Sequence, residues 1–158
     1  MFTNFKRAFA VVIATAAAVV AVPGIAFASD DNITIPINRI EANGAKTAAM
    51  TGSVAMYSGD CSMNVPSFVS ISPPTAAGNI LIQWEGWGYT RHTNNADVWN
   101  LYLNFRDASG NFVVSAPVLH GARMVDWYQV YGWDRYTSFA LPQYQFDRIA
   151  QVQWIGTC

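Results

Sequence analysis

Alternation of hydrophobic and polar residues is the dominant pattern in this chain. Along 79–89, side chains at every second position share one character, and because successive side chains of a strand point to opposite faces, this predicts a strand. The predicted inner face carries Ile80, Ile82 and Trp84. The predicted outer face is polar but also holds two large aromatics, and it carries Gln83, Glu85, Trp87 and Tyr89.

The segment 98–106 shows the same alternation more regularly and predicts a half-buried antiparallel strand. Its apolar set is Trp99, Leu101, Leu103 and Phe105, and its polar set is Asn100, Tyr102, Asn104 and Arg106. The residues that follow, 107–111, have the Gly-containing composition of a short hairpin connection. We therefore predict a return strand over 112–116, ending at Pro117.

The remaining strands are predicted at 33–37, 52–57, 67–71, 136–141 and 148–155. Pro36 places the first at an edge, because proline donates no ladder hydrogen bond. The small residues 45–49 are expected to form a helical turn or loop. The β-prone but aperiodic segment 125–131 is expected to bend at 132–135. With no convincing amphipathic helix, the pattern predicts an all-β antiparallel β-sandwich or jelly-roll-like barrel, with Trp84, Trp99 and Trp154 in its core.

The beginning of the chain has the parts of an export signal in their usual order. Lys6 and Arg7 precede an uncharged apolar run over 8–22, and Ala26-Phe27-Ala28 supplies a small-x-small cleavage motif. The run is shorter than the ~20 apolar residues of a membrane-spanning helix. We therefore expect 1–28 to be a cleavable signal peptide and 29–158 to be a single secreted β domain.

The two cysteines, Cys61 and Cys158, both lie in the part expected to be exported. An oxidising compartment favours pairing of thiols, and neither residue belongs to a CxxC motif. The sequence therefore predicts one disulfide that closes the fold.

The net charge of the chain without its leader argues against two classes of partner. Removal of Lys6 and Arg7 with the leader leaves seven Lys and Arg against ten Asp and Glu, a net charge of −3. Nucleic acids and anionic membranes need clustered positive charge, so neither is an expected partner. No later segment is long and apolar enough to span a membrane.

The usual catalytic and metal signatures do not occur. The sequence has no GxSxG motif, and His92 and His120 lack metal-ligand spacing, so we predict no catalytic residue, no metal site and no cofactor. Glycoside hydrolysis needs only two carboxyl groups at the right separation. Glu85, Asp97, Asp126 and Asp134 leave that possibility open.

The aromatic residues on polar faces suggest a binding site. If the strands 79–89 and 98–106 form a hairpin around 91–97, their polar faces make one surface on which aromatics lie among amides. Sugars suit such a surface, because their apolar ring faces stack on aromatic rings and their hydroxyls bond to amides and carboxylates. The alternative is that these aromatics contact a second sheet or loop. The predicted ligand-binding residues are Glu85, Trp87, Tyr89, Asn100, Tyr102 and Asn104.

The leading functional expectation is therefore a secreted, non-catalytic binding module for an extracellular glycan. A secreted protein-binding or enzyme-inhibitor protein is the main alternative, since Trp, Tyr and Arg also dominate protein interfaces. A membrane-active toxin and a small glycoside hydrolase using Glu85 with Asp97 or Asp126 stay open. Trp133 and Tyr136, with Asp134 and Arg135, form a second candidate patch.

Overall fold

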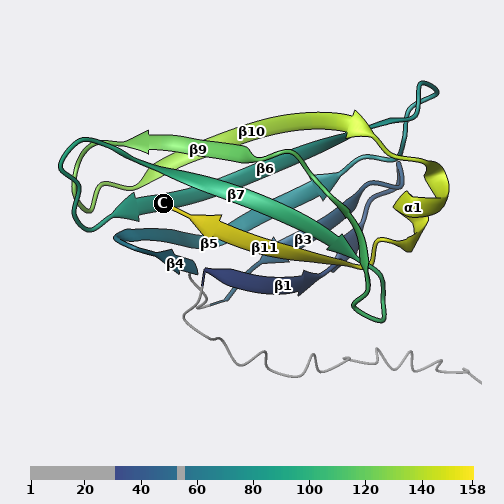
Figure 1. Ribbon diagram of the computed structural model, residues 1–158, viewed down its shortest axis with the longest axis horizontal. Coiled ribbons are helices and arrows are strands. Elements are labelled where there is room, and N and C mark those ends of the chain that lie inside the picture. The colour runs from purple at the N-terminus through teal and green to yellow at the C-terminus, as the bar shows by residue number, and fades with distance from the viewer. Residues whose placement is uncertain (1–30, 53–55) are drawn as a thin grey trace, which may run out of the picture.

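The computed structural model describes residues 31–52 and 56–158, which form two antiparallel β-sheets arranged like a sandwich (Figure 1). The predicted signal peptide lies outside the described residues. The five-stranded sheet contains β1 (Asn32–Pro36), β11 (Gln151–Thr157), β7 (Asp97–Arg106), β8 (Phe112–Ser115) and β9 (Leu119–Met124). The six-stranded sheet contains β10 (Tyr131–Ala140), β6 (Asn79–Thr90), β5 (Cys61–Ile71), β3 (Lys46–Met50), β2 (Arg39–Ile40) and β4 (Met56–Ser58).

The core lies between the two sheets and consists of the inward-facing alternate residues of their strands. Trp84 of β6, Trp99 of β7 and Trp154 of β11 are completely buried there, as the sequence predicts. Trp133 of β10 joins them, and its ring meets that of Trp84 edge-to-face at 5.0 Å between centroids. These four indoles give a small protein a large apolar volume to bury.

Glycines at inward positions make room for these indoles. A Cβ on Gly86 would lie 2.9 Å from Nε1 of Trp133, and one on Gly88 would lie 2.6 Å from the backbone oxygen of Ser62. A Cβ on Gly156 of β11 would collide with the ring of Trp99. The alternation of Trp and Gly along these strands is therefore a packing pattern, in which a missing side chain on one strand admits a ring from another.

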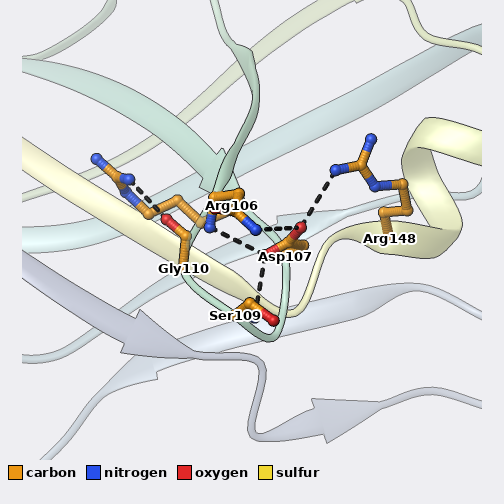
Figure 2. Close-up of polar contacts among 6 residues, drawn as sticks. Arg106, Asp107, Ser109, Gly110 and Arg148 are labelled. Carbon is orange, nitrogen blue, oxygen red and sulfur yellow. Dashed lines mark hydrogen bonds and ion pairs between the residues drawn. The ribbon is translucent and has the colours of Figure 1, made fainter.

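The hairpin predicted after β7 is present, and its loop is held by one carboxylate (Figure 2). Asp107 Oδ1 accepts hydrogen bonds from the backbone N–H groups of Ser109 and Asn111, at 3.0 and 2.9 Å. Its Oδ2 accepts from Arg148 at 3.2 Å. Arg106 donates across the same loop to the carbonyl of Gly110. The loop is thus fixed from within and tied to the short helix α1 (Gln143–Arg148).

At one edge of the sandwich, the side chain of Arg135 connects the two sheets. Arg135 of β10 donates from Nε to the carbonyl of His120 at 2.9 Å, and from Nη2 to the carbonyl of Gly121 at 3.3 Å. Both carbonyls belong to β9 of the other sheet. Among the described residues no backbone ladder joins the two sheets. The all-β prediction is confirmed, as are the two antiparallel sheets that the sandwich requires, and Cys61 and Cys158 form the predicted disulfide.

Several local predictions are wrong. Residues 45–49 fall almost entirely within strand β3 and not in a helical turn or loop, because Ala48 and its neighbours pair with the C-terminal part of β5. Residues 132–135 lie inside β10 and do not bend it. Strand β9 went unpredicted. Part of the predicted strand 52–57 lies outside the described residues, and β4 covers its end. The edge position of β1 is confirmed.

Candidate functional site

The six predicted ligand-binding residues all lie on outer faces but on different sheets. Glu85, Trp87 and Tyr89 belong to β6 of the six-stranded sheet, whereas Asn100, Tyr102 and Asn104 belong to β7 of the five-stranded sheet. The segment 91–96 crosses from one sheet to the other, so β6 and β7 do not form the hairpin that would merge their polar faces (Figure 1). The burial of alternate residues confirms both predicted strand phases. The proposed single surface is therefore divided into two surfaces that face away from each other.

The amides of β7 are occupied by neighbouring strands. Asn104 donates to Gln153 at 3.2 Å and accepts from Ser115 at 2.6 Å. The Oδ1 of Asn100 lies 2.6 Å from Nδ1 of His120. Such cross-strand hydrogen bonds leave these groups little capacity for a ligand. Tyr102 is the exposed member of this set, at 42%.

The outer face of the six-stranded sheet contains a shallow hollow of about 220 Å³. Strands β3, β5 and β6 and the end of β2 contribute to it through side chains that alternate with core residues. Its lining combines carboxylate, guanidinium, amide, hydroxyl and aromatic groups, supplied by Arg39, Glu41, Thr47, Phe68, Ser70, Gln83 and Glu85. One of the predicted site residues, Glu85, therefore borders a hollow.

A hydrogen-bonded network adjoins the hollow along β10. Gln83 donates from Nε2 to both carboxylate oxygens of Asp134, at 3.0 and 3.2 Å, and to the hydroxyl oxygen of Tyr136 at 3.1 Å. Tyr136 in turn donates to Asp134 at 2.6 Å. That bond raises the pKa of the Tyr136 phenol, and partial burial and the charges of Asp134 and Glu85 raise it further. The network fixes these side chains in one arrangement before any ligand arrives.

Glu85 supplies the free carboxylate of this face. It pairs directly with Asp134 across β6 and β10, and side chains at such positions lie about 4.5–5.5 Å apart at Cβ. No described residue donates a hydrogen bond to the Glu85 carboxylate, whereas Asp134 accepts three. The guanidinium of Arg39 is paired with Glu41 at 2.6 Å. The centre of the face is therefore anionic, with acceptor capacity left at Glu85.

Aromatic rings border these polar groups on both sides. Phe68 lies opposite Glu85 on β5 and lines the hollow. Trp87 follows on β6 beside Gly132, where an added Cβ would lie 3.0 Å from the indole Nε1. Tyr136 of β10 is the third ring, and it is 55% exposed. The sequence places Tyr136 in a separate patch with Trp133, but Trp133 points into the core, so this grouping is wrong.

The other candidate chemical groups do not converge on the hollow. Asp97 accepts a hydrogen bond from Thr90 at 2.5 Å, and Asp126 accepts one from Tyr131 at 3.1 Å, both near the end of the sheets where β6 ends. Among the described residues, one cluster with metal-ligand atoms close together comprises Cys61, Asp97 and Cys158. Its two sulfurs are joined in the disulfide, which removes them as thiolate ligands.

Sequence reasoning did not place most of this site: it missed the Asp134–Tyr136 pair and every lining residue except Glu85, namely Arg39, Glu41, Thr47, Phe68, Ser70 and Gln83. The segment 134–138 is polar at nearly every position, so the sequence carries no alternation there that would identify the outer face of β10. No signal in the sequence indicates that β5 and β10 flank β6.

No protein-family model matches this chain, and no curated protein or solved structure is significantly similar to it. In the described part of the chain, no helix is long and apolar enough to cross a membrane.

Proposed function

We propose that this protein is an exported, non-catalytic carbohydrate-binding protein whose binding face is the outer surface of the six-stranded sheet. The observation that carries the proposal is the hollow beside Glu85, where the half-buried rings of Phe68 and Trp87 and the exposed ring of Tyr136 lie among hydrogen-bonding groups held in fixed positions. Export is supported by the leader-like segment 1–28 and by the Cys61–Cys158 disulfide, which an oxidising compartment favours.

The chemistry of the face matches that of a sugar. A pyranose ring has apolar C–H faces that pack on aromatic rings, and Trp87, Phe68 and Tyr136 offer such rings. Its hydroxyl groups donate to carboxylates and accept from amides and hydroxyls. Glu85 supplies a free acceptor, while Thr47 and Ser70, 3.0 Å apart, supply hydroxyls at the hollow.

The negative charge of the face limits which polysaccharides it can bind. Glu85 and Asp134 carry negative charges, and the one lining guanidinium, Arg39, is already paired with Glu41. An anionic polysaccharide would meet like charge here, which is unfavourable. We therefore propose neutral or amine-bearing polysaccharides as ligands, and we expect uronate-rich or sulfated ones not to bind.

A second candidate function follows from the Glu85–Asp134 pair. Retaining glycoside hydrolases hold two carboxyl groups about 5–5.5 Å apart, and these two residues are direct cross-strand partners. Asp134, however, is held by three hydrogen bonds from Gln83 and Tyr136. Release of reducing ends from a bound polysaccharide, lost in a Glu85→Gln variant that still binds, would identify the protein as a hydrolase.

Binding is tested on residues 29–158, produced in an oxidising compartment and applied to an array of neutral, amine-bearing and anionic polysaccharides. Trp87→Ala removes the aromatic ring of the proposed face. We expect it to weaken binding by about tenfold or more, which corresponds to about 1.4 kcal/mol. Tyr102→Ala is the matched control, because Tyr102 is an exposed aromatic on the outer face of the other sheet.

The proposal requires wild type and Tyr102→Ala to bind equally and Trp87→Ala to lose binding while keeping its circular dichroism spectrum. Absence of binding to every neutral and amine-bearing polysaccharide would refute it. Loss of binding in Tyr102→Ala alone would assign the site to the five-stranded sheet instead.

A further inference from the structure

The outer face of β6 continues beyond the hollow to a group of tyrosines at the end of the sheet. Gln83, Glu85, Trp87 and Tyr89 follow one another along the strand on this face. At about 3.3 Å per residue, the row from Gln83 to Tyr89 is about 20 Å long. This row of side chains is longer than a single sugar ring and follows the direction of β6.

At its far end the row meets an aromatic side chain from a different segment. Tyr128 belongs to the β9–β10 loop, and its ring lies 6.0 Å from that of Tyr89, with 30° between the ring planes. The Tyr128 ring is 66% exposed. The two rings thus form a tilted aromatic surface open to solvent.

The backbone of Tyr128 is in an unfavourable conformation. Its φ is 58°, in the left-handed region, and Tyr128 is the only non-glycine residue of the described chain with a positive φ. A bulky side chain in this region is strained. The Tyr128 backbone N–H donates to the carbonyl of Thr90 at 2.8 Å, and the Trp127 indole donates to the carbonyl of Thr93 at 3.0 Å. These hydrogen bonds hold the exposed Tyr128 ring in place, although the Tyr128 backbone is strained.

A buried hydroxyl without a partner lies in the same region. Ser62 of β5 pairs with Tyr89 of β6 on one side and with Tyr57 of β4 on the other. Its Oγ is buried and makes no hydrogen bond, and the residue is 1% exposed. A buried hydroxyl without a partner is unfavourable, and a ligand hydroxyl entering between the tyrosine rings would provide one.

From these observations we infer that Tyr57, Ser62, Tyr89 and Tyr128 form a second saccharide subsite, and that the ligand is a polysaccharide chain lying along β6 from the hollow to Tyr128. This inference rests on the proposed function and specifies its ligand. A chain ligand contacts both the hollow and the tyrosines, whereas a short oligosaccharide is bound by the hollow alone. Affinity therefore rises with chain length, and Tyr128 is the residue that supplies the increase.

The test is a calorimetric titration with a length series of oligosaccharides, from two to eight sugar units, derived from the polysaccharide that binds best. For the wild-type protein we expect the longest oligosaccharide to bind at least about tenfold more tightly than the shortest. Tyr128→Gly removes the ring and also relieves the left-handed strain, because glycine tolerates a positive φ. Tyr128→Phe is the control that keeps the ring.

In Tyr128→Gly, the affinity difference between long and short oligosaccharides should disappear, with short-chain binding unchanged and a melting temperature equal to or above that of wild type. Tyr128→Phe should keep the difference. Unchanged length dependence in Tyr128→Gly, or no length dependence in wild type, would overturn the second subsite while leaving the proposed function standing. Failure of the wild type to bind any saccharide would remove both.

Discussion

At the scale of single residues, the alternation of apolar and polar positions determined which side chains are buried. Trp84, Trp99 and Trp154 occupy the core because each lies on the apolar phase of its strand. The glycines that make room for the rings of Trp99 and Trp133 could not be assigned from the sequence alone, because Gly86 and Gly88 suggest turns as readily as packing sites. Their role depends on which strand lies opposite, and a strand's own residues do not carry that information.

The fit between Gly156 and Trp99 gives a stability prediction. Gly156→Ala forces a methyl group against the Trp99 ring, and overpacking of this kind costs about 1–3 kcal/mol of the free energy of unfolding. Trp99→Phe removes the part of the indole that collides. In that background Gly156→Ala should therefore cost less, as measured by urea unfolding in a double-mutant cycle.

Gly88→Ala supplies the contrast for this cycle. Its Cβ would meet the backbone oxygen of Ser62 at 2.6 Å and the ring of Trp133 at 2.9 Å, both closer than Nε1 of Trp99 at 3.1 Å. Because Trp99→Phe leaves the two closer contacts in place, most of the cost of Gly88→Ala should persist in that background. An equal cost of Gly156→Ala with and without the Trp99 indole would show that the glycine serves another purpose.

At the scale of elements, local signals predicted hairpins well and strand partners poorly. The β7–β8 hairpin was predictable because Asp107, Ser109, Gly110 and Asn111 determine their own loop. The pairing of β6 with β7 was not, because 91–96 is long enough either to turn back within a sheet or to cross to the other sheet. Alternation indicates which face of a strand is buried, and both connections bury the same face. The residues of the predicted site are therefore divided: those on β6 lie on the face that contains the hollow, and those on β7 lie on the opposite sheet.

The Asp107 loop predicts a specific dependence of stability on pH. Its hydrogen bonds, first that from the Asn111 backbone N–H and then those from the Asn111 side chain, Arg148 and Ser109, lower the pKa of Asp107 below its ordinary value of 3.8. A carboxyl group whose pKa is lower in the folded state stabilises the fold above the unfolded-state value, and this stabilisation is lost as the pH falls through the folded-state value.

Asp107→Asn should therefore lower the melting temperature at neutral pH, and the difference from wild type should shrink below about pH 4. Thermal unfolding followed by circular dichroism, from neutral pH to about pH 2, measures this difference. Gln143→Ala, on the exposed side of α1, is a control that removes no charge. A difference between Asp107→Asn and wild type that stays constant over the whole range would contradict the account.

At the scale of the whole molecule, the two sheets give the protein two outer faces of different character. On the five-stranded sheet, the amides Asn100 and Asn104 are engaged by His120, Gln153 and Ser115. On the six-stranded sheet, a hollow, a free carboxylate and exposed rings are available together. The disulfide attaches the end of β11 in one sheet to the start of β5 in the other. Closing a loop of this length contributes about 4–5 kcal/mol in the chain-entropy model.

Binding of ligands to the outer face of the six-stranded sheet can be observed residue by residue, through backbone amide chemical shifts measured by NMR during titration with the best-binding oligosaccharide. We expect the largest shifts at Gln83, Glu85, Trp87, Asp134 and Tyr136, with Asn100, Tyr102 and Asn104 unaffected. Shifts concentrated on β7 and β11, with β6 and β10 unchanged, would contradict the account.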